Sequence, residues 1–308
     1  MSLYIPDDLL GHVPNPRFQA RHGNSLQTID NDGLRCNGET SPAREPAILA
    51  VGDSYTYGEE VNDAETWPAY LQQLTGRRVL NGGVTGYGFD QAVLRAGQLA
   101  DKYNPSVIIV SFLEDDLRRA EMRTLWWRDK PWFAIEDGQL VHKAACAPDL
   151  AKLPRQLHSF VGRCFDKLPS HLRARAHFGT NQLASALSPQ LQQWLGYCVR
   201  AHPAGVGVEI AHRLIERLAD LQGNRGSRIV IVAQYPPVVW ADRSEATRQR
   251  RATQAVLDRA AACGLATLDT YSRLAAEPAP HRLYATSHMN ARGNLMVASV
   301  LKARLPDP

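Results

Sequence analysis

The stretch from Ala47 to Ser54, AILAVGDS, is a continuous apolar run that ends in a turn carrying a serine. Apolar residues that do not alternate with polar ones are typical of a strand covered on both faces, as in a parallel sheet. We therefore expect a parallel strand here, with Ser54 just beyond its carboxyl end. Further apolar runs predict four other strands, at residues 79–80, 107–112, 229–233 and 265–268.

Helical patterns lie between and after these runs, at residues 89–102, 208–221, 246–263 and 291–305. Alternation of strands and helices without an internal repeat predicts an α/β fold. We expect a doubly wound, flavodoxin-like, five-stranded parallel sheet flanked by helices. With 308 residues the chain is long for one such domain and short for two, so a single domain with additions is expected.

Two segments do not follow the alternation. Residues 1–45 contain several prolines and the sequence Asn31-Asp32-Gly33, which predicts an N-terminal arm with a β-hairpin at the Asp-Gly turn. Residues 46–308 form the predicted α/β domain, interrupted at about residues 124–207 by a large insertion that we expect to be helical. Insertions in open α/β sheets leave from strand ends, where the ligand crevice lies, so a lid or specificity subdomain is expected.

Composition favours an ordinary globular protein, with 44% hydrophobic and 21% charged residues, and the net charge of +4 gives little support for nucleic-acid binding. The absence of GxGxxG, P-loop and clustered metal-ligand patterns predicts no cofactor and no metal. No signal-peptide pattern or long apolar run is present, which predicts a cytoplasmic protein without a membrane partner. The cysteines are odd in number and scattered, which indicates reduced thiols: Cys36, Cys146, Cys164, Cys198 and Cys263.

The turn Gly52-Asp53-Ser54 has a chemical use. A serine that follows a buried strand and opens a helix lies where helix amides can stabilise a developing anion. The alternative interpretation is a serine N-cap without catalytic role. In either case, we expect Asp53 to hold the turn through hydrogen bonds to backbone amides.

Together with two later stretches, this turn resembles the SGNH/GDSL hydrolase superfamily of serine esterases and acyltransferases. The stretch Asn81 to Gly88, NGGVTGYG, is similar to the second block of that family, and Ser287 to Asn294, SHMNARGN, looks like its last block. The resemblance covers the sheet core within residues 46–308. It implies that Ser54 is the nucleophile, that His288 is its base, and that the amides of Ser54 and Gly86 bind the oxyanion, with Asn81 and Asp53 in supporting positions.

The sequence departs from the family pattern where the catalytic acid is expected. The family has an aspartate three residues before the histidine, and this chain has Ala285 there. Asp269 is a substitute because it ends the fifth predicted strand, although it is also placed to cap the helix that follows. Two further arrangements fit the same sequence: a Ser–His dyad whose ring is held by a backbone carbonyl, and a site that has lost its activity.

A second departure lies after the third predicted strand, where Asp115 occupies the position of the family's oxyanion-binding asparagine. An ionised carboxylate would repel a developing oxyanion. Asp115 is therefore expected to be protonated, to be turned away from the site, or to have its role filled by another donor.

These residues predict an acyl-enzyme on Ser54 formed from a small-molecule ester, thioester or acylated sugar. Hydrolysis and O-acyl transfer are both compatible with it, and the two departures support a third function, a catalytically inactive binding module. Residues 118–133 contain five cations and three tryptophans. They predict either a rim for an anionic or sugar-bearing substrate or, as we favour, aromatic packing beneath basic side chains. No nucleic-acid partner is expected.

Overall fold

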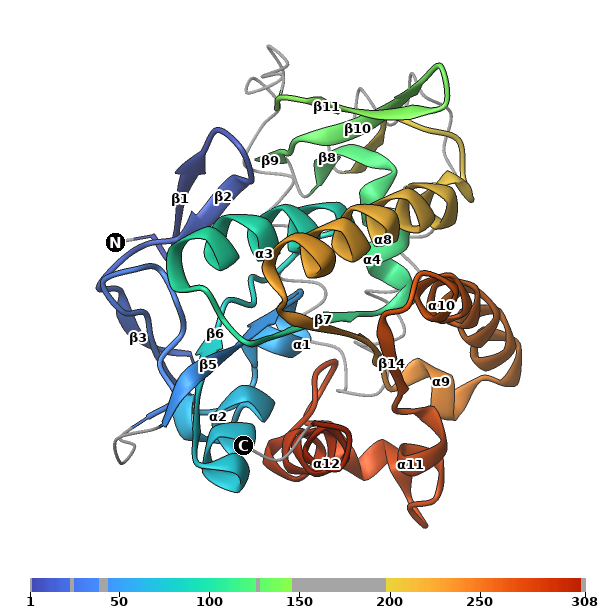
Figure 1. The fold of residues 1–308 in the computed structure, drawn as a ribbon. Helices are drawn as coiled ribbons and strands as arrows, with labels where there is room; N and C mark the ends of the chain where they lie inside the picture. The colour runs from blue at the N-terminus through green and yellow to red at the C-terminus, as the bar shows by residue number, and fades with distance from the viewer. Residues whose placement is uncertain (1, 23–24, 39–43, 126–127, 146–197, 306–308) are drawn as a thin grey trace, which may run out of the picture.

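The structure is a computed structural model that describes residues 2–22, 25–38, 44–125, 128–145 and 198–305. Its centre is a five-stranded parallel sheet with the strand order β14-β13-β7-β5-β6 (Figure 1). In chain order this is 2-1-3-4-5, the flavodoxin-like order, so the predicted fold is confirmed. The strands are β5 (Arg44–Val51), β6 (Arg77–Asn81), β7 (Val107–Phe112), β13 (Arg228–Ala233) and β14 (Ala266–Asp269).

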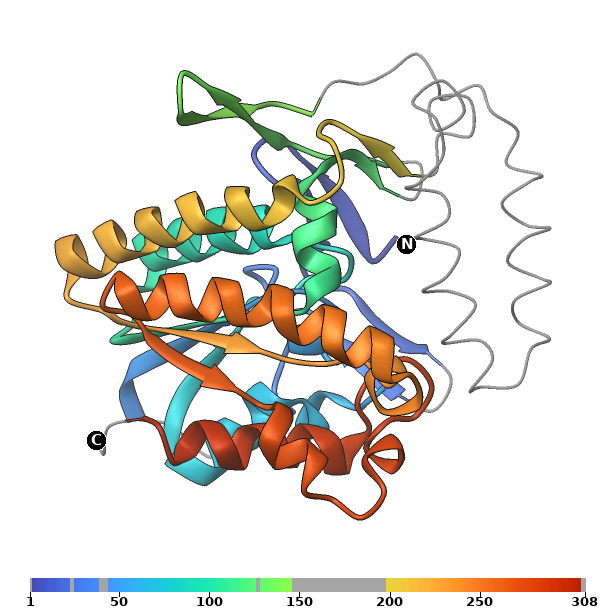
Figure 2. The same ribbon diagram turned by 90° about the vertical axis from the view of Figure 1, so that its right-hand side faces the viewer.

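Two layers of helices cover the sheet (Figures 1 and 2). All six residues of β7 are buried, and its side chains alternate between the two layers. One layer consists of α3 (Phe89–Tyr103), α8 (Val206–Arg225) and α10 (Arg243–Ala262), and the other of α2 (Trp67–Thr75) and α12 (Ala291–Lys302). Burial on both faces explains why the strands are continuously apolar in sequence.

Local signals set the ends of these helices. Thr66 caps α2 by accepting a hydrogen bond from the backbone N–H of Ala69, and Asn290 caps α12 by accepting one from Gly293. Gly76 and Asn104, both with positive φ, end α2 and α3. The predicted helices lie within a few residues of their positions in the structure, whereas α2 was not predicted.

The N-terminal arm contains two hairpins, β1 (Tyr4–Asp7) with β2 (Gly11–Pro14) and β3 (Gln19–His22) with β4 (Ser25–Thr28). At Asp32-Gly33 the chain turns, with Gly33 at a φ of 74°, and a short antiparallel pairing follows through a bridge between Ile29 and Arg35. The N–H of Asp30 donates to the Leu34 carbonyl and the N–H of Cys36 to the Thr28 carbonyl, so backbone bonds lie on both sides of this bridge. The N–H of Arg35 donates to the Asn81 carbonyl of β6 and joins this part of the arm to the sheet.

The described part of the insertion is made of short strands, so the prediction of a helical insertion is wrong for these residues. β8 (Met122–Leu125) pairs with β9 (Arg128–Asp129) and with β12 (Cys198–Arg200), and β10 (Trp132–Glu136) pairs with β11 (Gln139–Lys143). Residues 146–197, on which the rest of that prediction falls, lie outside the described part of the chain.

Short helices complete the structure: α1 (Ser54–Tyr57), α4 (Glu114–Ala120), α9 (Val238–Ala241), α11 (Tyr271–Ala275) and two 3₁₀ turns at Asp63–Glu65 and Pro280–Leu283. Among the helices of the described ranges, none combines the length and apolar character needed to cross a bilayer.

The glycines give a direct test of this packing. Gly97 lies inside α3, and a Cβ added there meets no atom within 4 Å. We expect Gly97→Ala to raise the free energy of unfolding by about 0.5–1 kcal/mol, because alanine loses less backbone entropy in a helix. At Gly83 a Cβ would lie 2.3 Å from the backbone nitrogen of Tyr57, so Gly83→Ala should lower stability. Urea denaturation measures both, and equal effects would contradict this packing.

Candidate active site

Ser54 lies in a tight turn at the carboxyl end of β5. Asp53 caps α1, its Oδ1 accepting a hydrogen bond of 2.9 Å from the backbone N–H of Tyr55. Gly52 has a φ of 156°, and a Cβ there would lie 2.4 Å from the Thr56 Oγ1, so the turn requires glycine. The turn faces the switch point between β5 and β7, where ligands bind in open α/β sheets.

The loop that follows α1 is held by a buried arginine of the arm. The Arg35 guanidinium forms an ion pair of 3.1 Å with Asp63 and donates to the backbone oxygens of Tyr57, Gly58 and Val61. Its side chain is fully buried. Arg35 therefore fixes the path of the chain from the serine to the two glutamates beyond Gly58.

His288 meets Ser54 across the sheet edge. The His288 Nε2 lies 2.8 Å from the Ser54 Oγ, within hydrogen-bonding distance. The loop that carries the histidine is held in two ways: the Tyr55 hydroxyl donates to the Ser287 carbonyl at 2.6 Å, and the Ala285 N–H donates to the His288 carbonyl at 3.0 Å. The structure thus brings together the predicted nucleophile and base, although 234 residues separate them.

The carboxylate nearest the other ring nitrogen belongs to Glu60. Its Oε1 lies 3.5 Å from the His288 Nδ1, and the Ser287 Oγ lies 3.1 Å from the same nitrogen. Glu60 also accepts hydrogen bonds from the backbone N–H and the hydroxyl of Thr286. Glu60 therefore lies where a carboxylate can orient the imidazole, and this place was not predicted from the sequence. The available signal was its position six residues after Ser54 in the nucleophile loop.

The charges of this cluster shift its pKa values. Burial alone would raise the pKa of Glu60, but its hydrogen bonds to His288 and Thr286 and the nearby His288 charge lower it to about 2. Burial would lower the pKa of His288, but the hydrogen bond to Glu60 and the charges of Glu59, Glu60 and Asp53 raise it above its ordinary value. The cluster therefore favours an ionised Glu60 beside a strongly basic imidazole.

The structure does not bring Asp269, the acid considered from sequence, to the histidine. Its Oδ1 accepts a hydrogen bond of 2.9 Å from the backbone N–H of Tyr271 at the start of α11. This is the capping role that sequence analysis gave as the alternative. Among the described residues, the carboxylates found within 3.5 Å of the His288 ring nitrogens are those of Glu59 and Glu60.

Asp115 is turned into an ion-pair network on α4. Its carboxylate lies 2.7 Å from the Arg118 Nε and 2.8 Å from the Arg119 Nη2, and Arg119 also pairs with Asp116 at 2.9 Å. A carboxylate paired with two guanidinium groups accepts hydrogen bonds from them, so it offers no donor to an oxyanion. The Arg119 Nη1 lies 3.4 Å from the Asp53 Oδ2, the same oxygen that the Ser54 Oγ approaches at 3.3 Å. A buried positive charge therefore lies beside the nucleophile.

Backbone amides are the donors available for an oxyanion. Within the described ranges, no hydrogen bond is found for the N–H of Ser54 or the N–H of Gly86. Gly86 has a φ of 83°, a conformation that favours glycine. The second-block loop is shaped by Asn81, whose side-chain oxygen accepts a hydrogen bond from the Gly83 N–H at 3.1 Å.

A second glutamate lies on the serine side of the imidazole. The Glu59 Oε2 lies 3.5 Å from the His288 Nε2 and 3.4 Å from the Thr85 Oγ1. Consecutive glutamates thus flank the two ring nitrogens, and the Glu59 charge contributes to the raised pKa of His288. Nothing in the sequence motif indicated this arrangement.

In the basic and aromatic segment 118–133, some side chains take part in internal ion pairs and packing, and others line a cavity. Arg118 and Arg119 belong to the ion pairs of α4, and Trp132 packs edge-on against His202. Arg128 and Lys130 line a cavity beside Gly86. Residues 126–127 lie outside the described part of the chain. Among the residues that are described, no group of three or more His, Cys, Asp or Glu side chains is arranged to hold a metal ion.

Comparisons with known proteins found solved structures only. No protein-family model and no curated protein matches the chain. A variant of an acetyl xylan esterase from Geobacillus stearothermophilus aligns over 86% of this chain and 96% of its own, with 11% identity and a TM-score of 0.48. A lipase/acylhydrolase from Enterococcus faecalis aligns over 86% and 99%, with 12% identity and a TM-score of 0.46.

A member of the lipolytic G-D-S-L family from Veillonella parvula aligns over 84% of this chain and 99% of its own, with 12% identity and a TM-score of 0.44. Its description names the family that the sequence motifs resemble. At these identities and TM-scores, the roles of Ser54, His288 and Glu60 depend on their own geometry in this chain.

The low pKa of Glu60 predicts how stability depends on pH. A carboxyl with a pKa of about 2 in the folded chain and about 4.5 when unfolded stabilises the fold above pH 4.5, and this contribution disappears as the pH falls towards 2. We expect Glu60→Gln to be less stable than the unmodified chain at pH 6, by about 1–3 kcal/mol.

That difference should shrink as the pH falls from 5 to 2. Urea denaturation across this range measures it, with Glu209→Gln, a change at an exposed glutamate on α8, as the control. A difference between Glu60→Gln and the unmodified chain that stays constant with pH would refute an ionised, hydrogen-bonded Glu60.

Proposed function

We propose that this protein is a serine-dependent enzyme of the SGNH/GDSL type that cleaves small ester or thioester substrates through an acyl-enzyme on Ser54. The observation that carries the proposal is the contact of 2.8 Å between the Ser54 Oγ and the His288 Nε2, with a carboxylate facing the opposite nitrogen. Nucleophile, base and orienting acid in this geometry activate serine hydroxyls on many unrelated folds.

Proton transfer follows from the hydrogen bonds. Neutral His288 with its proton on Nδ1 faces Glu60 and the Ser287 hydroxyl, which leaves Nε2 free to accept the Ser54 proton. The serine oxygen attacks the substrate carbonyl, and the imidazolium is stabilised by Glu60 on one side and Glu59 on the other. The imidazolium then gives its proton to the leaving group, and the acyl group remains on Ser54.

The oxyanion of the tetrahedral intermediate would be bound by the N–H groups of Ser54 and Gly86. Arg119 supports the Gly86 loop, because its guanidinium donates to the Tyr87 carbonyl at 3.1 Å. In this proposal, the two backbone amides take the place of the asparagine side chain. Deacylation by water gives hydrolysis and deacylation by an acceptor hydroxyl gives O-acyl transfer, with the same residues in both.

Covalent labelling tests the nucleophile. We expect a fluorophosphonate probe to label the protein once, and Ser54→Ala to lose the label and at least about a thousandfold of its p-nitrophenyl acetate turnover. Circular dichroism checks that the variant is folded, and mass spectrometry of the labelled peptide locates the adduct. Labelling that persists in Ser54→Ala would refute the assignment, and a folded protein without labelling or turnover would favour the binding module.

The pH dependence of kcat/KM tests the base and the acid. Because the pKa of His288 is raised, we expect kcat/KM to rise with pH to a midpoint above 6.5. Glu60→Gln should move this midpoint to lower pH, since a raising charge is removed, and should lower kcat by about a hundredfold or more. Asp269→Asn, at the acid considered from the sequence, is the control and should leave the midpoint in place. A midpoint that moves with Asp269 and not with Glu60 would overturn the choice of acid.

A further inference from the structure

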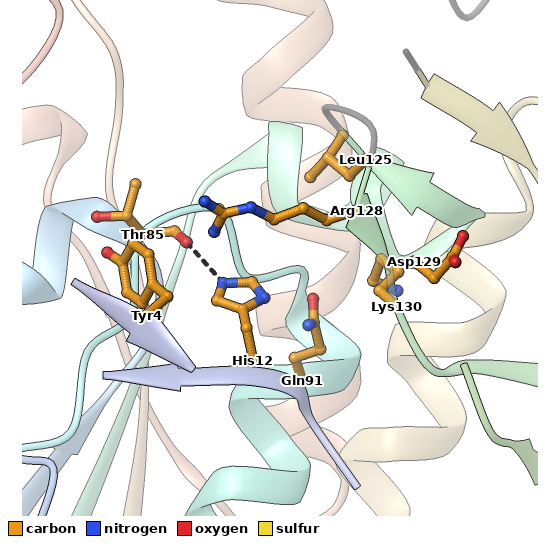
Figure 3. A pocket seen from close by; sticks show the side chains of 9 residues that line it. Tyr4, His12, Thr85, Gln91, Leu125, Arg128, Asp129 and Lys130 are labelled. Atoms are coloured by element: carbon orange, nitrogen blue, oxygen red, sulfur yellow. Dashed lines mark hydrogen bonds between the residues drawn. The ribbon is translucent and has the colours of Figure 1, made fainter. Parts of the chain in front are cut away.

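A small cavity lies beside the candidate active site, beneath the N-terminal arm. Figure 3 shows it between the hairpin of β1 and β2, the loop of Thr85 and the strand β9. Its volume is about 210 Å³, below the roughly 300 Å³ at which pockets for whole drug-sized ligands begin. Gly86, a proposed oxyanion donor, lines the cavity. One part of a substrate would therefore lie in the cavity while its carbonyl is bound at Ser54.

One wall of the cavity carries a buried acceptor without a partner. The His12 Nε2 lies 3.2 Å from the Thr85 carbonyl oxygen, which requires the ring proton on Nε2 and leaves Nδ1 as an acceptor. Burial, together with the charges of Arg128, Arg95 and Lys130, lowers the pKa of His12 to about 4. Within the described part of the chain, the buried His12 Nδ1 has no hydrogen-bond partner. A hydroxyl donor in the cavity would supply the missing bond.

The mouth of the cavity carries a cation. The Arg128 guanidinium lies over the ring of Tyr4 at 5.4 Å and extends across His12 towards Thr85 (Figure 3). Among the described residues, no carboxylate pairs with it. The acidic groups around the cavity are otherwise engaged. Asp90 pairs with the buried Lys130 at 2.6 Å, and the carboxylate of Asp129, which points away from Arg128, accepts a hydrogen bond from Thr124.

We propose that this cavity is a substrate subsite for a hydroxy acid group, whose carboxylate pairs with Arg128 and whose hydroxyl donates to the His12 Nδ1. A guanidinium is the side chain best matched to a carboxylate, because its planar N–H groups can bind both oxygens. The assignment deepens the proposed function, because it names the polar part of the ester that Ser54 would cleave. It also gives the N-terminal arm a role, since β1 and β2 supply Tyr4 and His12.

Binding of free acids tests the subsite without any need for turnover. Isothermal titration calorimetry at pH 7 would use L-malate as the hydroxy acid, succinate as the same diacid without the hydroxyl, and succinamide as a neutral probe. We expect malate to bind at least fivefold more tightly than succinate, and succinamide not to bind. Arg128→Gln should weaken malate binding at least tenfold, whereas Arg123→Gln, which changes an exposed arginine of β8, should not alter it.

Equal malate affinity in Arg128→Gln and the unmodified chain would overturn the subsite, and equal affinity of malate and succinate would overturn the role of His12. Ser54→Ala separates this proposal from the proposed function. It should bind malate normally, so malate binding without fluorophosphonate labelling of the unmodified chain would leave the subsite standing and reject the enzyme. Labelling at Ser54 without any malate binding would reject the subsite alone.

Discussion

The carboxylate of Glu60 connects the two distant segments of the chain that form the candidate site. It belongs to the loop that follows the nucleophile, and it accepts hydrogen bonds from Thr286, two residues before the histidine. The same group faces the His288 Nδ1 at 3.5 Å. One ionised side chain thus holds the histidine loop, orients the imidazole ring and favours the tautomer with its proton on Nδ1. The contact between the His288 Nε2 and the Ser54 Oγ depends on all three.

This arrangement places several carboxylates near one serine, and arginine side chains offset their negative charge. Buried ionised groups are costly unless they are paired, and Arg119 contacts three of the carboxylates, those of Asp53, Asp115 and Asp116. Arg119 lies four residues after Asp115 on α4, so the carboxylate at the expected asparagine position has its counter-charge on the same helix. Asp115, where the family has an asparagine, therefore belongs to a network in which carboxylates and guanidinium groups are paired.

Much of the fold could be predicted from the sequence, because parallel strands buried on both faces produce continuous apolar runs. The proximity of Ser54 and His288 was also predicted, through the resemblance of the stretches that carry them to two blocks of the SGNH/GDSL family. The place of Glu60 beside His288 was not predicted, because its contact with Thr286 spans 226 residues and its position six residues after Ser54 was the one local signal. The hairpin of β1 and β2 was not predicted, because the residues between its strands, Asp8 to Leu10, contain no glycine or asparagine.

In the proposed mechanism, the nucleophile, both flanking glutamates and one oxyanion amide come from residues 54–60, and the carboxyl-terminal loop contributes the imidazole. Most of the reactive groups therefore belong to one short segment that follows β5. With the carboxylate supplied by that segment, the histidine loop needs no acid of its own, which is compatible with alanine at position 285. The stability of the segment after the serine then controls the geometry on both sides of the imidazole ring.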